Sequence, residues 1–387
     1  MNESDVFKLF DYDNELISAL NSILSGMVRE YLIAIMHPGR YFTIRVNNIL
    51  VSTDYIAEYF AKLGYNVRVH PLFSEVVLVE TEGPFEIPIE DKIVIADKYA
   101  AESVYQGANL YVPGILSINP LVKRGDYVTI NAPNGFSVGW GVSNINASDI
   151  RKGGKGLAVT TLISRFKLPK VRELDIYSKG YIYNQSIPAI VASRELDPQP
   201  NEVIVDMCAA PGGKTTHIAI LSECKAKVIA VDHSQKRIQR MTEEIERMKL
   251  KNIIVIRADS RYLDVDFNIK ADKVILDPPC SALGVRPKVY DKKSYRDILT
   301  LREYQKQFIK PAYNILKKDG ILVYSTCTIT KEENEEIIEY ALTHFKFELE
   351  DLKYKIGDTV LNGGAQRFYP HKHDMPGYFI AKLRKLN

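Results

Sequence analysis

Short apolar segments alternate with amphipathic helical segments in the carboxyl-terminal half of the chain. From residue 202 onward the apolar runs are EVIVDM, KVIAVD, NIIVIRAD, DKVILD and GILVYST. Unbroken runs of this kind, rich in β-branched residues, are typical of strands that are buried on both faces of a parallel sheet. The pattern predicts an α/β fold with a doubly wound parallel sheet. The run YFIAKL near the carboxyl terminus is expected to form an edge strand of that sheet.

The amino-terminal part has a different pattern. Apolar positions over residues 13–36 recur at helical spacing and stop at His37-Pro38-Gly39, which predicts one amphipathic helix. A second helix is expected to begin near Ser52 or Thr53 and to end at Gly64. Strands are expected in YNVRVHPLF and EVVLVET, which makes this part a small α/β unit.

The central part consists of short β-rich runs broken by Gly and Pro. Asn134-Gly135 is expected at the turn of a hairpin, and the whole texture is typical of a compact β-barrel. We therefore expect three domains. They are an α/β unit at 1–90 that packs on the catalytic domain, a barrel at 92–168, and the doubly wound domain at 169–387.

Composition limits the class of protein. The chain has 387 residues, of which 46% are hydrophobic and 26% charged, as in globular proteins with several cores. It has no apolar run of the roughly 18 residues that cross a membrane. Its first residues lack the basic and apolar regions of a secretory signal, so we expect a cytoplasmic protein with no membrane partner.

Cysteine and histidine usage does not indicate a metal or disulfide framework. The four cysteines are few and widely spaced, which favours reduced thiols over CxxC ligand pairs. His371 and His373 lack a third ligand in the sequence and are expected in an exposed loop. The prediction is therefore that the protein holds no metal.

Positive charge is concentrated in one segment. The net charge is only +3, but the segment from Arg151 to Gly180 has eight basic and two acidic residues, a local charge of +6. The rest of the chain therefore sums to −3. Such a segment can contact phosphates without reading a base sequence, although a solvated linker face would look the same.

Four predicted strands end in aspartate, at Asp206, Asp232, Asp259 and Asp277. In doubly wound sheets, ligands bind over the carboxyl ends of the strands. The first strand leads into the small-residue turn 208–214, where a backbone can approach a nucleotide closely. A P-loop is disfavoured, because Cys208 stands where that motif requires glycine.

Asp232 follows the glycines at the distance expected for a carboxylate that binds ribose hydroxyls. Alternatively, Asp232 only caps the helix that begins near Ser234, and Asp259 only caps a turn. Their shared position beside the glycine turn favours a nucleoside-bearing cofactor.

Cys280 and Cys327 follow the fourth and fifth predicted strands. If these strands are neighbours, about 4.8 Å apart, both thiols lie over one point beside the cofactor. A thiolate that adds to C6 of cytosine turns C5 into a carbon able to attack an electrophilic methyl group. Asp277 can interact with the ring as charge develops there. The alternative is a pair of structural cysteines, and the residues alone leave the two thiol roles interchangeable.

These motifs resemble a known family. DMCAAPGGKT, AVDHSQKR, ADS, LDPPCSALG, YSTCT and Glu333-Asn334-Glu335 closely resemble the Sun/RsmB-type RNA (cytosine-5) methyltransferases. The resemblance implies a Rossmann-like domain that uses S-adenosylmethionine. It implies that Cys327 is the nucleophile on C6, that Cys280 helps to release the product, and that Asp277 and Lys214 contact the cytosine. The implied cofactor site comprises Cys208, Ala209, Ala210, Pro211, Gly212, Gly213, Lys214, Asp232, Arg237, Asp259 and Asp277.

The central part resembles a PUA domain, on AAESVYQGANLYVPGILS, KRGDYVTI and the predicted hairpin. Within the family this domain marks the branch that methylates a cytidine of the tRNA acceptor stem, at position 72 near the CCA end. The resemblance implies that tRNA is the partner, with its CCA end held by the PUA domain. Candidate RNA contacts are Tyr111, Arg151, Lys152 and Lys155, whereas Tyr105 and Trp140 are expected mainly in the barrel core.

Two alternatives stay open from the sequence. One is a ribosomal RNA cytosine-5 methyltransferase, because the catalytic motifs are shared across RNA targets. The other is an RNA-binding factor without catalysis, which the paired thiols disfavour. The protein is expected to act as a monomer.

Overall fold

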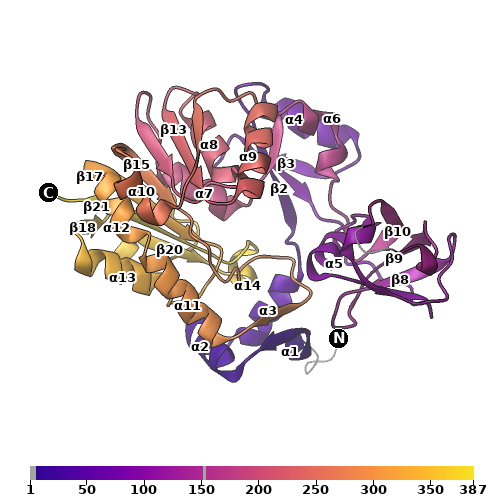
Figure 1. Ribbon diagram of the computed structural model, residues 1–387. Helices are drawn as coiled ribbons and strands as arrows, with labels where there is room; N and C mark the ends of the chain where they lie inside the picture. The colour runs from indigo at the N-terminus through magenta and orange to yellow at the C-terminus, as the bar shows by residue number, and fades with distance from the viewer. Residues whose placement is uncertain (1–5, 151–153) are drawn as a thin grey trace.

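The carboxyl-terminal half of the chain folds around one nine-stranded sheet (Figure 1). The computed structural model describes residues 6–150 and 154–387. The strand order is β14-β13-β12-β15-β17-β21-β20-β19, and β18 also pairs with β21. The strands β14 to β17 run parallel in this order, which confirms the predicted α/β fold. The bounds are β12 Val203–Asp206, β13 Lys227–Asp232, β14 Ile253–Arg257, β15 Ala271–Leu276, β17 Leu316–Thr326, β18 Phe347–Leu349, β19 Asp358–Val360, β20 Ala365–Phe368 and β21 Tyr378–Lys385.

Helices cover both faces of this sheet. One apolar core lies between the sheet and α7, α8 and α9, and a second lies between the sheet and α10, α12 and α13. Because both faces are buried, the strands need the continuous apolar runs seen in the sequence. The helices are α7 Ile187–Glu195, α8 Gly213–Leu221, α9 Gln235–Arg247, α10 Leu263–Asp266, α11 Tyr295–Lys306, α12 Ile309–Ile315, α13 Glu335–His344 and α14 Pro370–His373.

The prediction that YFIAKL forms an edge strand is wrong. The strand β21 lies inside the sheet, where it pairs antiparallel with β17 on one side and with β18 and β20 on the other. Residues 378–381 are all buried, as an interior strand requires. The short strands that cover it, β18, β19 and β20, lack long apolar runs, so the sequence pattern did not reveal them.

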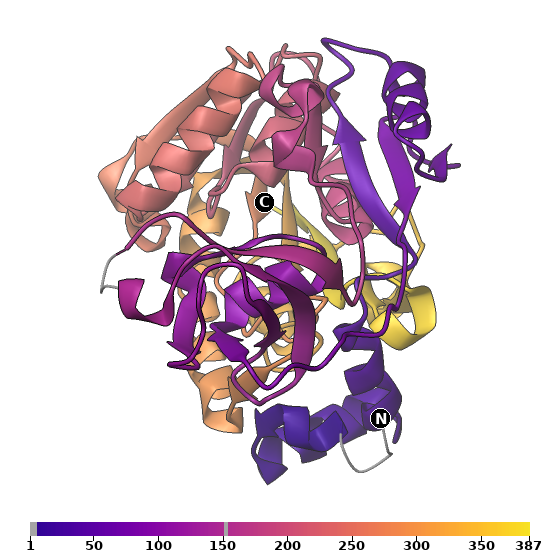
Figure 2. The same cartoon turned by 90° about the vertical axis from the view of Figure 1, so that its right-hand side faces the viewer.

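The central part forms a six-stranded sheet in the order β6-β10-β9-β8-β5-β7, with α5 packed against it (Figures 1 and 2). Gly135 has a left-handed φ of 83° at the turn between β8 and β9, which confirms the predicted hairpin. The bounds are β5 Ile93–Ala96, α5 Lys98–Tyr105, β6 Leu110–Tyr111, β7 Ile115–Ile118, β8 Tyr127–Asn131, β9 Ser137–Ser143 and β10 Leu157–Ser164.

The single helix predicted over residues 13–36 is in fact two helices. They are α2 (Asn14–Leu24) and α3 (Val28–Met36), which meet at a bend of 98°. Ser25 and Gly26 both take left-handed φ values, 51° and 89°, and these end α2 although the apolar spacing continues. No single helix within the described ranges is long and apolar enough to cross a membrane; only this bent pair passes that test of length and composition.

The amino-terminal segment contributes to two separate places rather than forming one unit (Figures 1 and 2). Helices α1 (Val6–Leu9), α2 and α3 pack against Leu283, Ile298 and Ile329 of the catalytic part. The strand β1 (Phe10–Tyr12) pairs with β16 (Asp291–Lys293).

A four-stranded sheet lies at the other end, in the order β11-β2-β4-β3. Its outer strand β11 follows the central unit in sequence, and it pairs with β2, which precedes that unit. The segment before α7 therefore belongs to this sheet. Ser52 caps α4 as predicted. The bounds are β2 Tyr41–Val46, α4 Thr53–Lys62, β3 Val67–Val69, β4 Val76–Glu80, α6 Asp175–Ser178 and β11 Ile182–Asn184.

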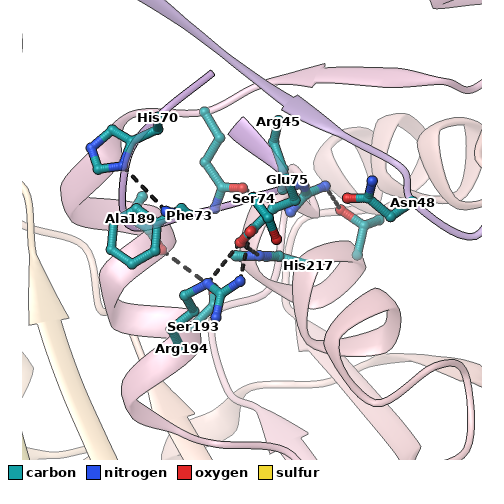
Figure 3. Close-up of polar contacts among 12 residues, drawn as sticks. Arg45, Asn48, His70, Phe73, Ser74, Glu75, Ala189, Ser193, Arg194 and His217 are labelled. Atoms are coloured by element: carbon teal, nitrogen blue, oxygen red, sulfur yellow. Dashed lines mark hydrogen bonds and ion pairs between the residues drawn. The ribbon is translucent and has the colours of Figure 1, made fainter. Parts of the chain in front are cut away.

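A buried polar cluster joins this sheet to the catalytic domain (Figure 3). The carboxylate of Glu75 accepts two hydrogen bonds from Arg194, at 2.7 and 2.6 Å, and lies 3.1 Å from Nε2 of His217. Arg45 is fully buried and donates to Gly213 O and to Thr216 Oγ1, both at 2.7 Å. Through Arg45, the amino-terminal sheet holds the first turn of α8.

Acid should weaken this junction. Burial lowers the pKa of His217 from 6.5 to about 4, so the unfolded chain takes up a proton between those pH values that the folded chain does not. Burial raises the pKa of Glu75, but hydrogen bonds from His217 and Arg194 hold it well below its usual value, which has the same consequence at lower pH. The stabilisation is therefore present at neutral pH and lost as pH falls.

We expect the free energy of unfolding to fall between pH 7 and pH 4.5, with up to about 2 kcal/mol of the change due to His217. Denaturant titrations of the wild type and His217→Gln measure this difference. The substitution of the exposed His344 by Gln is the control. Equal pH dependence in the wild type and His217→Gln would contradict the assignment.

Candidate active site

Two thiols meet at the carboxyl edge of the central sheet. The strands β15 and β17 are parallel neighbours, with Leu276 opposite Tyr324, and the loops that follow them carry Cys280 and Cys327. The two Sγ atoms lie 3.3 Å apart, and each cysteine is partly exposed. Gly284 N also donates to Cys327 O, at 3.0 Å. The structure thus brings together the two cysteines that the sequence places at strand ends.

The two thiols have different acidities. The hydrogen bond with Cys327, together with burial, raises the pKa of Cys280 well above its usual value. The same hydrogen bond, with Lys214 nearby, lowers the pKa of Cys327 against the opposing effects of burial and Asp277. The lower pKa of Cys327 favours its thiolate over that of Cys280, which makes Cys327 the candidate nucleophile.

Lys214 and Asp277 form an ion pair beside the thiols. Burial lowers the pKa of Lys214, but the charge of Asp277 and the hydroxyl of Tyr378 raise it well above its usual value. Ser325 donates to the other oxygen of Asp277 at 3.2 Å, and Tyr378 donates to Ser325 at 3.3 Å. The ammonium group of Lys214 therefore stays charged where negative charge would develop on a substrate ring.

Sequence reasoning missed Ser325 and Tyr378. Ser325 was visible within the motif YSTCT, but no rule of spacing assigned it a contact. Tyr378 begins β21, and its position became apparent only when that strand proved to lie beside β17.

The glycine turn links the end of β12 to the start of α8. Gly212 has a φ of 102°, which disfavours a side chain at the bend, and Thr215 Oγ1 donates to Asp206 at 2.7 Å. Burial raises the pKa of Asp206 to about 6. The backbone of residues 208–213 therefore lies at the carboxyl edge of the sheet, directly before Lys214.

A pocket lies between the turn and the next two strand ends. The pocket is lined by the carboxylates of Asp232 and Asp259 and by apolar and aromatic side chains. Carboxylates suit the hydroxyl groups of a nucleoside, and apolar side chains suit its flat base. The lining residues are Met207, Cys208, Asp232, His233, Arg237, Ala258, Asp259, Ser260, Pro279, Tyr304 and Phe308. Tyr304 and Phe308, which sequence reasoning missed, are four residues apart at the junction of α11 and α12.

Both aspartates also have local structural roles. Asp232 accepts from Ala210 N at 3.3 Å and Ser234 N at 2.9 Å, and lies 3.1 Å from Arg237. The cap of α9 is Ser234 itself. Asp259 accepts from the backbone and guanidinium of Arg261, which lowers its pKa. Asp232 and Asp259 therefore each make local hydrogen bonds and also line the pocket.

Two of the candidate RNA contacts, Tyr111 and Lys155, lie near each other on the central unit, because Tyr111 is opposite Leu157 and Val112 N donates to Gly156 O at 2.9 Å. Tyr111 is 54% exposed, and Lys155 is also exposed. Tyr105 is buried in the core, as expected, whereas Trp140 is only partly buried and stacks on the exposed Tyr127 at 4.8 Å.

The candidates Arg151 and Lys152 lie outside the described residues. Farther along the basic segment, Lys179 pairs with Asp175 at 2.6 Å and Lys167 with Glu82 at 3.4 Å. These pairs neutralise part of the local positive charge.

The prediction that His371 and His373 lie in an exposed loop is wrong. They belong to the short helix α14, where His371 packs edge-on against Tyr31 of α3. His373 accepts from Tyr369 N and contacts Asp358 at 3.2 Å. Within the described ranges, no group of three or more His, Cys, Asp or Glu side chains is arranged to hold a metal ion.

Comparisons with known proteins agree with this geometry. A family profile described as 16S rRNA methyltransferase RsmB/F matches residues 193–384, and a PUA domain profile matches residues 92–162. The chain is 43% identical over 353 residues to a tRNA (cytosine(72)-C(5))-methyltransferase of Pyrococcus horikoshii, with 90% of each chain covered. It is 26% identical over 521 residues to the rRNA (cytosine-C(5))-methyltransferase NOP2C of Arabidopsis thaliana, with 90% of this chain and 86% of that protein covered.

Among solved structures, the chain is similar to the crystal structure of NSun6 from Pyrococcus horikoshii with SFG. The TM-score is 0.91 at 40% identity, and the match covers 97% of this chain and 99% of that chain. The likeness therefore includes the central unit as well as the doubly wound domain.

If the pocket holds the nucleoside of S-adenosylmethionine, Asp232→Asn should weaken cofactor binding about tenfold, or about 1.4 kcal/mol, because a carboxylate accepts hydroxyl hydrogen bonds more strongly than an amide. Isothermal titration calorimetry with the cofactor measures this. Asp264→Asn is the matched control, since Asp264 lies outside this pocket and bonds to Asn314. Equal affinity of Asp232→Asn and wild type would rule out the ribose contact.

Proposed function

The chain belongs to the RsmB/F-type family of S-adenosylmethionine-dependent RNA cytosine-5 methyltransferases, in its PUA-containing branch, and from this premise we propose that it methylates C5 of a tRNA cytosine, C72 of the acceptor stem. The observation that carries the proposal is the pair of thiols 3.3 Å apart beside the ion pair of Lys214 and Asp277. An RNA-binding factor without catalysis has no need of this arrangement.

The reaction begins with Cys327. Its thiolate adds to C6 of the cytosine, an S–C6 bond forms, and the electron pair of the C5–C6 double bond becomes available at C5. Lys214 faces the ring and stabilises the negative charge that develops on it, and Asp277 holds Lys214 in place through their ion pair. When bound in the pocket, S-adenosylmethionine supplies the electrophilic methyl group that C5 attacks.

The release step needs a second group. The C5 proton leaves to water, the electron pair re-forms the C5–C6 double bond, and the S–C6 bond breaks to return Cys327 as a thiolate. Cys280 is the group placed to assist this step, because its sulfur lies beside that of Cys327. The pair of thiols thus divides the addition and release steps.

The central unit contacts the loop that carries Cys280, which supports a target held by both domains. Lys98 of α5 bonds to Asp291 at 2.5 Å, and Asn134 donates to Val289 O at 2.9 Å. RNA bound by the PUA domain therefore lies close to the thiols. A base at the end of a stem is also cheap to flip out, which fits an acceptor-stem target.

The thiol roles are tested by substitution. Methyl transfer from labelled S-adenosylmethionine to unmodified tRNA should fall at least about a thousandfold in Cys327→Ala, because the remaining thiol, Cys280, has a raised pKa and keeps its proton. Cys280→Ala should form a covalent protein–RNA adduct that persists in denaturing gels. Cys224→Ala is the control, since Cys224 packs against the helical layer away from the site. An adduct that forms through Cys280 would reverse the two roles.

The RNA target is tested with transcripts. We expect tRNA with an intact CCA end to be methylated at C72, and removal of the CCA end to lower kcat/KM at least about tenfold, because the PUA contacts are lost. Sequencing after bisulfite conversion locates the modified base. Methylation of ribosomal RNA fragments alone would favour the ribosomal alternative and overturn the tRNA target.

A further inference from the structure

The residues that follow the two thiols are tied to each other. Ser281 comes directly after Cys280, and Thr328 comes directly after Cys327. Their hydroxyl oxygens lie 2.8 Å apart, and both side chains are buried. The two thiol loops are therefore joined one residue beyond the sulfur atoms.

The carboxylate of Glu333 binds residues of both thiol loops. Its side chain is fully buried just before α13, and its carboxylate contacts both loops. One oxygen accepts from Ser281 N at 2.8 Å and from Gln305 Nε2 at 3.0 Å. The other accepts from Ser281 Oγ at 2.5 Å and from Thr330 Oγ1 at 2.9 Å.

These contacts indicate an ionised carboxylate. The backbone N–H and the amide N–H₂ can only donate, and the Ser281 hydroxyl donates to Glu333 if it accepts from Thr328. Every partner named above can then donate, and these hydrogen bonds oppose burial, which raises the pKa of Glu333. A buried negative charge with four hydrogen bonds is costly to place and is stabilised only by this full set of donors.

We propose that Glu333 is a positioning residue for the thiol pair: its carboxylate fixes the Cys280 loop against the Cys327 loop, and its negative charge keeps their shared proton on Cys280. This deepens the proposed function, since that function assigns addition to Cys327. Glu333 touches neither substrate nor cofactor in this scheme. It acts through Ser281.

The charges around the thiols are arranged consistently with this role. Besides the hydrogen bond with Cys327 and burial, the charge of Glu333 raises the pKa of Cys280, with a further contribution from Asp277. The cations Lys214 and Lys288 act in the opposite direction on Cys327. Asp277 raises the pKa of both thiols, so the difference between them comes from Glu333 acting on Cys280 and from Lys214 and Lys288 acting on Cys327.

Glu333→Gln tests the proposal without RNA, because it keeps the size of the side chain and removes its charge. Iodoacetamide labelling from pH 6 to pH 9, read by peptide mass spectrometry, gives the labelling rates of the two cysteines. In the wild type Cys327 should react faster than Cys280. In Glu333→Gln the ratio of the two rates should fall at least about threefold, since one pKa unit changes the thiolate fraction about tenfold.

Glu335→Gln is the matched control. Glu335 is a nearby carboxylate, 15% exposed, that pairs with Arg367 rather than with the thiol loops. Its loss should leave the labelling ratio unchanged. Glu333→Asp, which keeps the charge, should restore most of the ratio. An unchanged ratio in a folded Glu333→Gln protein overturns the proposal.

If Glu333→Gln does not fold, Ser281→Ala provides the same test, because it removes the hydroxyl that joins Glu333 to Thr328. The labelling ratio should again fall, and an unchanged ratio again overturns the proposal. A wild-type protein that fails to methylate tRNA but shows the shifted ratio in these variants would refute the proposed function and leave the role of Glu333 intact.

Discussion

The close approach of two thiols is the interaction on which the rest of the site depends. Parallel strands lie about 4.8 Å apart, so two loops that leave neighbouring strands at the same edge bring their side chains together. In this protein the strands are β15 and β17, and the result is an Sγ–Sγ distance of 3.3 Å. At that distance the two sulfur atoms form a hydrogen bond, which raises the pKa of Cys280 and lowers that of Cys327. The ion pair and the pocket beside them matter for catalysis only if that division holds.

The three parts of the chain converge on this edge. Asp291 is almost fully buried where they meet, and it binds Tyr12 from the amino-terminal segment, Lys98 from the central unit and Lys288 from its own loop. Lys288 in turn donates to Ala282 O, two residues from Cys280. On the other side of the site, Arg45 holds the first turn of α8. The loops that carry the thiols are thus supported by elements distant in sequence.

Sequence patterns predicted the parallel strands, the glycine turn and the meeting of Cys280 with Cys327, because each depends on local periodicity or on the geometry of strand ends. The break at Ser25 was not predicted, since a left-handed residue interrupts a helix without changing the apolar spacing. The inner position of β21 was not predicted either, because its neighbours are short strands brought in by tertiary pairing. Arg45, Glu333 and Tyr378 were missed as site residues for the same reason: their contacts lie far away in sequence.

The central claim is that Cys280 keeps its proton and donates a hydrogen bond to Cys327, so that Cys327 is the nucleophile. Titration of the two thiols by NMR, with cysteine labelled at Cβ with ¹³C and assigned through Cys→Ser variants, tests it directly. The account predicts that Cys327 ionises at a lower pH than Cys280, and that Cys280→Ala raises the pKa of Cys327. Ionisation of Cys280 before Cys327 would contradict the account.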